Sequence, residues 1–137
     1  MTAPSIPQRH ILVVDDEPFV CEAVKMMLDF DGHIVETTNS GREALATLET
    51  KSFDVVITDF YMPEMKGDEL ATRIKARNPK QPVVMITAYA EMLPNSLPGV
   101  DCMVSKPFLL ENLREAIFKV APVRPIQRTE GNQPPSP

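Results

Sequence analysis

The chain has 137 residues, of which 43% are hydrophobic and 24% charged, so it has the size of one domain and an ordinary globular composition. Its formal net charge of -5 disfavours nonspecific binding to nucleic acid or an anionic membrane, and acidic groups gathered at one place would attract a cation. No apolar run is long enough to span a bilayer, and the polar first nine residues lack the hydrophobic segment of a secretory signal. Cys21 and Cys102 do not have zinc-site spacing. We therefore expect a cytoplasmic protein with two reduced, buried thiols.

Short apolar runs alternate with amphipathic segments along the chain. The runs predict buried strands, because each is short and rich in β-branched residues. These strands are predicted at 10–14, 34–38, 53–58, 82–86 and 100–104. The amphipathic segments predict a helix from Pro18 to just before Asp31-Gly32, a second capped by Ser40 with Glu43 three residues on, and two more at 67–77 and 109–120. In the first helix the residues at helical spacing are Phe19, Val20, Ala23, Val24, Met27 and Leu28; we expect Met26, Met27 and Met85 in or near the core.

Prolines interrupt the segment between the fourth and fifth predicted strands. Pro94 and Pro98 fall where a crossover helix belongs, and a proline inside a helix removes a donor and clashes with the preceding turn. A short or distorted fourth helix, or a loop, is expected there. At the two ends of the chain, residues 1–8 are expected to form a flexible arm, and the proline-rich residues 122–137 a disordered tail or a linker.

This alternation of strands and helices indicates an α/β fold. Strands that alternate with helices form a parallel sheet with right-handed crossovers and helices on both faces. We expect a flavodoxin-like, doubly wound sheet of five strands in the order 2-1-3-4-5, within a domain covering residues 9–121.

Polar residues follow four of the five predicted strands. They are Asp15, Asp16, Asp59, Thr87 and Lys106. Because the carboxyl ends of parallel strands share one edge, these side chains are expected to meet at the switch point of the sheet. Three close carboxylates repel one another, and a divalent cation such as Mg²⁺ resolves the repulsion. Together with the Lys106 ammonium and the Thr87 hydroxyl, the metal would neutralise a phosphoryl group in transfer to Asp59.

The same residues resemble the response-regulator receiver domains of two-component signalling, of which the chemotaxis regulators are examples. The resemblance covers about residues 9–121 and rests on Asp15-Asp16, Asp59, Met62-Pro63 with Gly67, Thr87-Ala88 and Lys106-Pro107-Phe108. It implies a switch that accepts phosphate on Asp59 from a histidine kinase or a phosphotransfer protein. Such a switch catalyses only its own phosphorylation and autodephosphorylation, and it acts through contacts with a downstream protein or, weakly, with a second copy.

The resemblance also assigns roles around Asp59. It implies that Asp16 binds Mg²⁺ directly and Asp15 through water, and that the backbone carbonyl of Tyr61 completes the metal site together with Asp59. Lys106 would contact the phosphoryl group, and its bond to Pro107 would be cis.

Four positions carry the expected switching behaviour. The resemblance implies that Thr87 moves toward the phosphate. The aromatic residue that the family usually has three positions before the lysine is here Met103, so we expect an altered readout. Tyr61 and Tyr89 border the phosphoryl site, and we hypothesise that their rings lengthen the phosphoryl lifetime.

Two other functions share features with this sequence. A binding module that keeps this fold without phosphorylation is favoured by Met103 and the broken fourth helix, although the complete acidic set argues against it. A phosphatase of the haloacid dehalogenase type requires a second aspartate two residues after the nucleophilic one. In this sequence that position is Tyr61, which argues against the phosphatase. Failure to bind Mg²⁺ would favour the binding module.

Overall fold

The computed structural model describes residues 6–94 and 96–122 as a three-layered α/β fold. The predicted arm and tail therefore lie largely outside the described residues. The strands are β1 (His10–Val14), β2 (Ile34–Thr38), β3 (Val55–Asp59), β4 (Val83–Thr87) and β5 (Cys102–Ser105). The helices are α1 (Pro18–Phe30), α2 (Gly41–Thr50), α3 (Gly67–Arg77), the 3-10 turn η1 (Ala90–Met92) and α4 (Leu110–Val120). All strands are parallel, in the order β2-β1-β3-β4-β5, which confirms the predicted topology.

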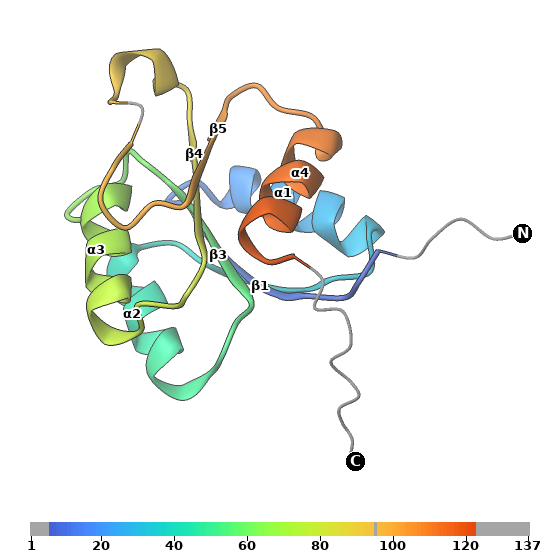
Figure 1. Ribbon diagram of the computed structural model, residues 1–137, viewed down its shortest axis with the longest axis horizontal. Helices are drawn as coiled ribbons and strands as arrows, with labels where there is room; N and C mark the ends of the chain where they lie inside the picture. Colours follow the sequence, from blue (N-terminus) through green and yellow to red (C-terminus); the bar gives the residue numbers. More distant parts are fainter. Residues whose placement is uncertain (1–5, 95, 123–137) are drawn as a thin grey trace, which may run out of the picture.

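Each face of the sheet is covered by a pair of helices (Figure 1). Helices α1 and α4 pack on one face, where Ile11, Val13 and Ile57 contact the buried sides of both helices. Helices α2 and α3 pack on the other, against Leu12 and Val14. Alternate residues of β1 thus point to opposite cores, and both faces are apolar because both are covered. None of the helices that the structure describes is long and apolar enough to cross a membrane.

Three side chains lie elsewhere than expected. Phe19 and Met26 are 90% and 68% exposed, so the expectation that Met26 lies in or near the core was wrong. The side of α1 that faces the core carries Cys21, Val24 and Leu28 instead. Leu109, placed by its periodicity in the final helix, lies just before the first turn of α4 and is 65% exposed. In both helices the sequence offers apolar residues on more than one face, and periodicity alone does not select between them.

The connection between β4 and β5 contains only η1 as a helical element among its described residues, in agreement with the predicted shortened helix. Gly99 brings this connection against α3. It has a positive φ of 81°, and a β-carbon there would lie 2.8 Å from the Ala71 carbonyl carbon. Val100 packs into the core beneath α3. The backbone of this irregular segment therefore lies directly against the backbone of α3. The axis of a full helix would lie farther from α3, because side chains would separate the two helices.

Gly67, the first residue of α3, sits directly behind the end of β3. A β-carbon at this position would collide with the backbone carbonyl oxygen of Asp59 and lie 3.1 Å from the Phe60 Cα. The Gly67 N–H also donates to the Phe60 carbonyl at 2.8 Å. Glycine is thus required where α3 meets the turn after Asp59.

We predict that Gly67→Ala lowers the free energy of unfolding by about 1–3 kcal/mol, because the backbone must shift to admit a methyl group. Gly41→Ala is the matched control at the start of α2. Its β-carbon would meet the end of the Met65 side chain, which can move, so its cost should be smaller. Urea unfolding measures both variants, and equal stabilities would contradict the requirement.

Asp31, just after α1, forms a two-point ion pair with Arg114 of α4. Arg114 donates from Nε and Nη2 to the Asp31 carboxylate at 2.7 and 2.6 Å, and the Asp31 side chain is 1% exposed. The hydrogen bonds from Arg114 hold the pKa of Asp31 below its usual range despite the opposing effect of burial. The pair joins α1 and α4 across 83 residues of sequence.

We predict that Arg114→Ala lowers the urea midpoint at neutral pH, because it leaves a buried carboxylate without its partner. A carboxyl group whose folded pKa is depressed contributes stability above its unfolded pKa of about 3.9 and loses that contribution as pH falls through the folded value. The difference between wild type and variant should therefore shrink below about pH 4. Arg73→Ala, which removes an exposed pair with Glu69, should change little at any pH. A difference independent of pH would contradict this account.

Candidate functional site

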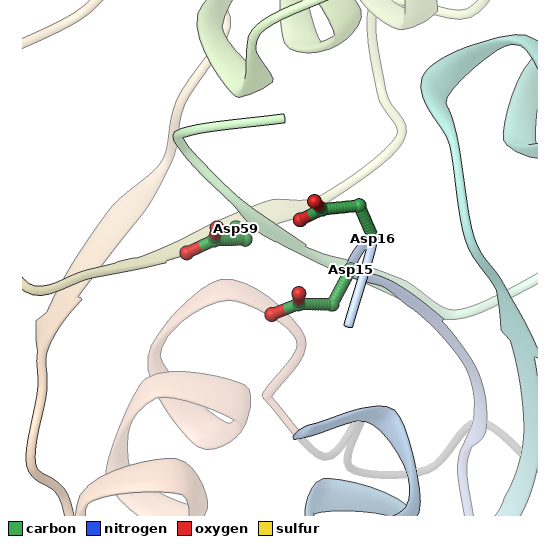
Figure 2. Close-up of side chains that lie close together, drawn as sticks. All are labelled: Asp15, Asp16 and Asp59. Carbon is green, nitrogen blue, oxygen red and sulfur yellow. The ribbon is translucent and has the colours of Figure 1, made fainter. Parts of the chain in front are cut away.

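Three carboxylates meet at the carboxyl edge of the sheet. Asp59 is the last residue of β3, and Asp15 and Asp16 follow β1. These strands are neighbours, with Val14 paired to Thr58. One oxygen from each carboxylate lies within 4.8 Å of the others, and Figure 2 shows the three side chains together at the ends of their strands. The order of the strands brings together residues that are 43 or more positions apart in the sequence.

Asp15 is the most constrained of the three. The Glu17 backbone N–H donates to Asp15 Oδ1 at 2.9 Å, which fixes the carboxylate after the strand. Its pKa is raised to about 6, mainly by burial, with a smaller contribution from the negative charges of Asp59 and Asp16. Asp15 is therefore a buried acid within a cluster of like charges, and perturbed acids of this kind are frequent at functional sites.

Lys106 supplies the positive charge nearest to these carboxylates among the described residues. Its Nζ lies 3.0 Å from Asp59 Oδ1 and 3.8 Å from Asp15 Oδ2. The Lys106 backbone N–H donates to the Thr87 carbonyl at 2.9 Å, and the bond to Pro107 is cis, as expected. One ammonium thus pairs with two of the three carboxylates, and it lies closer to Asp59 than to Asp15.

Thr87 and its surroundings form the other side of the site. Thr87 ends β4, pairs with Ser105 of β5 and is 1% exposed. Its Oγ1 accepts a hydrogen bond from the Tyr89 backbone N–H at 3.0 Å. Met103 lies in β5 opposite Met85 and is partly buried. A flexible thioether therefore occupies the position three residues before Lys106 that is usually aromatic in the family.

Two residues that support Asp15 were not predicted from the sequence. Asn39, just after β2, donates from Nδ2 to the Asp15 carbonyl at 3.0 Å. The Cys21 thiol lies 3.3 Å from the same oxygen, and burial raises the pKa of this thiol to about 11. Cys21 is buried as expected, whereas Cys102 is only partly so. Asn39 directly follows a strand at the same edge of the sheet as the aspartates. This position in the sequence could have indicated that Asn39 belongs to the site.

The arrangement suits a hard divalent cation. Carboxylate oxygens within reach of one another are ligands that Mg²⁺ accepts, and Mg²⁺ commonly uses one or two carboxylates with waters and phosphate oxygens. The Asp59 side chain is 12% exposed, and Lys106 contacts its Oδ1.

A family model described as the response regulator receiver domain matches residues 11–118. The chain belongs to the response-regulator receiver family. The match spans every strand and helix described above except the first residue of β1 and the end of α4. Receiver domains are signalling modules and not conventional enzymes, and they bind Mg²⁺ at an acidic site of this kind.

Curated relatives agree with this assignment. The chain is 34% identical over 106 residues to the probable transcriptional regulatory protein TcrX of Mycobacterium tuberculosis, covering 75% of this chain and 45% of TcrX. It is 35% identical over 107 residues to the response regulator MprA of Mycolicibacterium vanbaalenii, covering 76% and 46% of the two chains. The receiver domain therefore spans less than half the length of these relatives.

Solved structures share the fold along nearly their whole length. Response regulator TrrA of Thermotoga maritima, in complex with Mg²⁺ and BeF, is 33% identical with a TM-score of 0.76, covering 82% of this chain and 98% of TrrA. Chemotaxis response regulator CheY4 of Vibrio cholerae is 31% identical with a TM-score of 0.71, covering 83% and 99%. These likenesses confirm the predicted flavodoxin-like fold.

Proposed function

We propose that this receiver domain accepts a phosphoryl group on Asp59 from the phosphohistidine of a histidine kinase or a phosphotransfer protein. The observation that carries the proposal is the position of the Asp59 carboxylate, between two further aspartates and the Lys106 ammonium at 3.0 Å. A carboxylate in such surroundings is a competent nucleophile, because the charge that develops during transfer has a cationic partner already in place.

The residues present fit Mg²⁺, and we assign its ligands as Asp16 and Asp59, Asp15 through water, and the backbone carbonyl of Tyr61. When bound, the ion would neutralise the carboxylates and the phosphoryl oxygens together. The clustering of the three carboxylates supports this assignment, and the pKa of Asp15 is raised to about 6 mainly by burial, with a smaller contribution from the charges of Asp59 and Asp16.

The transfer itself requires little of the protein beyond placement and charge. The phosphorus–nitrogen bond of the donor breaks as a phosphorus–oxygen bond to an Asp59 carboxylate oxygen forms, and the bonding electron pair returns to the imidazole nitrogen. Lys106 remains paired with the transferred group, and the Thr87 hydroxyl donates to one of its oxygens. Water later cleaves the acyl phosphate, which restores the Asp59 carboxylate and releases phosphate.

The output of the switch is contact with another protein. The net charge of -5 gives this domain no electrostatic attraction for nucleic acid, although relatives such as TcrX are named as transcriptional regulators. The irregular β4–β5 connection and Met103 support an output surface that differs from one built on a full helix and an aromatic readout.

The experiment that tests the proposal is intact mass spectrometry after incubation with acetyl phosphate and Mg²⁺. We expect one phosphate adduct on the wild-type chain and none on Asp59→Asn or after removal of Mg²⁺ with EDTA. Asp16→Asn should need a Mg²⁺ concentration at least about tenfold higher, because it loses a charged ligand. A folded wild type that forms no adduct, under conditions that phosphorylate another receiver, would favour the phosphorylation-independent binding module.

We further propose that Tyr61 and Tyr89 slow the loss of phosphate. Both rings stand two residues beyond site residues, and they contact each other. The double variant Tyr61→Asn with Tyr89→Ala should lose phosphate about threefold faster or more, because water reaches Asp59 more easily. Phe118→Ala, which removes an exposed ring from α4, is the control. An unchanged half-life of the adduct in the double variant would contradict this role.

A further inference from the structure

The rings of Tyr61 and Tyr89 form a bridge between two loops at the carboxyl edge of the sheet. Tyr61 lies in the loop after β3 and Tyr89 in the connection after β4. Their centroids are 4.9 Å apart and their planes are inclined by 82°, which is the favoured edge-to-face arrangement. We call this pair the tyrosine clasp. It joins the loop that follows Asp59 to the loop that follows Thr87.

The clasp is anchored on the Tyr61 side and free on its outer side. The ring of Phe60, which is 7% exposed, packs against Tyr61 edge-to-face at 4.7 Å. Lys66 Nζ lies 5.7 Å from the centroid of the Tyr61 ring, within the range of a cation–π contact. Tyr61 and Tyr89 themselves are 49% and 47% exposed. Because about half of each ring is outside the core, the clasp can open without disrupting the packing of the sheet.

A hydrogen bond connects the clasp to the site. The Tyr89 backbone N–H donates to Thr87 Oγ1 at 3.0 Å, and Thr87 is otherwise held by its carbonyl, which accepts from the Lys106 N–H. The Thr87 side chain is buried, so water does not readily replace its hydroxyl as a hydrogen-bond partner. The Tyr89 N–H therefore keeps its acceptor only while the Thr87 hydroxyl points toward it. Asp59 is two residues from one ring and Thr87 is two residues from the other, so both ends of the clasp are tied to the site.

We propose that the tyrosine clasp is the conformational readout of the chemical state of Asp59, an inference that rests on the proposed phosphorylation. A phosphoryl group at the end of β3 offers anionic oxygens beside β4, and a charged acceptor attracts a hydroxyl donor more strongly than a neutral one. The Thr87 side chain turns toward it, and Tyr89 loses its hydrogen bond. The clasp then opens on its Tyr89 side and moves η1, which begins at the next residue, whereas Tyr61 stays packed against Phe60 and still hinders water. Tyr61 and Tyr89 act as positioning residues in this scheme. The movement of Thr87 reaches the surface through them, so no aromatic residue is needed at position 103.

The composition of the chain makes the clasp directly observable. It has two tyrosines and no tryptophan, so the ring signals of a tyrosine-labelled sample belong to the clasp alone. We would record ring ¹³C and amide ¹⁵N spectra of the full chain before and after addition of Mg²⁺ with beryllofluoride, a phosphoryl analogue. Both ring signals and the Tyr89 amide should shift in the wild type and in Phe118→Ala, and none should shift in Asp59→Asn.

Two threonine variants test the link without any ligand. In Thr87→Val the shape is kept but the acceptor is lost, so the Tyr89 amide should exchange its hydrogen about tenfold faster, and the rings should already occupy their open positions. Thr87→Ser keeps the hydroxyl and should resemble the wild type. Tyr89→Phe should preserve the response of the Tyr61 ring, whereas Tyr89→Ala should abolish it.

The outcomes separate this inference from the proposed function. If the mass adduct forms on Asp59 but both ring signals stay in place with beryllofluoride, the clasp is not a readout and the phosphoacceptor role stands. If Thr87→Val leaves the Tyr89 amide and both rings unchanged, the hydrogen bond does not control the clasp. If neither the adduct nor the spectral response appears, both proposals fail.

Discussion

The repulsion among three carboxylates is the interaction on which the rest of this structure depends. Asp15, Asp16 and Asp59 are brought together because β1 and β3 are adjacent and both end at one edge. In water the groups would separate, but here the strands are fixed by two cores and cannot do so. The excess charge can therefore be relieved only by a bound proton, by Lys106 or by a cation. The pKa of Asp15 is raised mainly by burial, and the charges of Asp59 and Asp16 raise it further.

The supporting contacts around the site make sense as responses to that charge. Glu17 and Asn39 both direct N–H groups at Asp15, one at its carboxylate and one at its carbonyl. The Lys106 N–H donates to the Thr87 carbonyl, so the turn after β5 that carries the ammonium is tied to the end of β4, the neighbour of the strand that carries Asp59. Gly67 allows α3 to begin against the carbonyl of Asp59 itself. The backbone of Asp59 is thus closely packed against the start of α3.

Much of this arrangement follows from local sequence. A strand that ends in a charged residue is visible as a break in an apolar run, and α3 has the predicted bounds because Gly67 opens it and Asn78-Pro79 closes it. β3, β4 and β5 begin one or two residues later than expected, because the apolar residues before them belong to the turns that enter the sheet. The exposed faces of Phe19 and Leu109 depend on how each helix is rotated against the sheet, which only tertiary packing decides. The contact between Tyr61 and Tyr89 likewise joins two loops whose shapes no periodicity describes.

The two ends of the described fold meet on the side of the sheet opposite the site. Arg9, which precedes β1, donates from Nη2 to the carbonyl of Ala121, which follows α4. The five residues of β3 separate this junction from Asp59 by roughly 17 Å at about 3.3 Å per residue. A fluorescent protein or affinity tag fused at residue 122 would therefore emerge away from the acidic edge and leave it open to a donor. Cyclisation through residues 9 and 121 would likewise close the chain across a contact that the fold already makes.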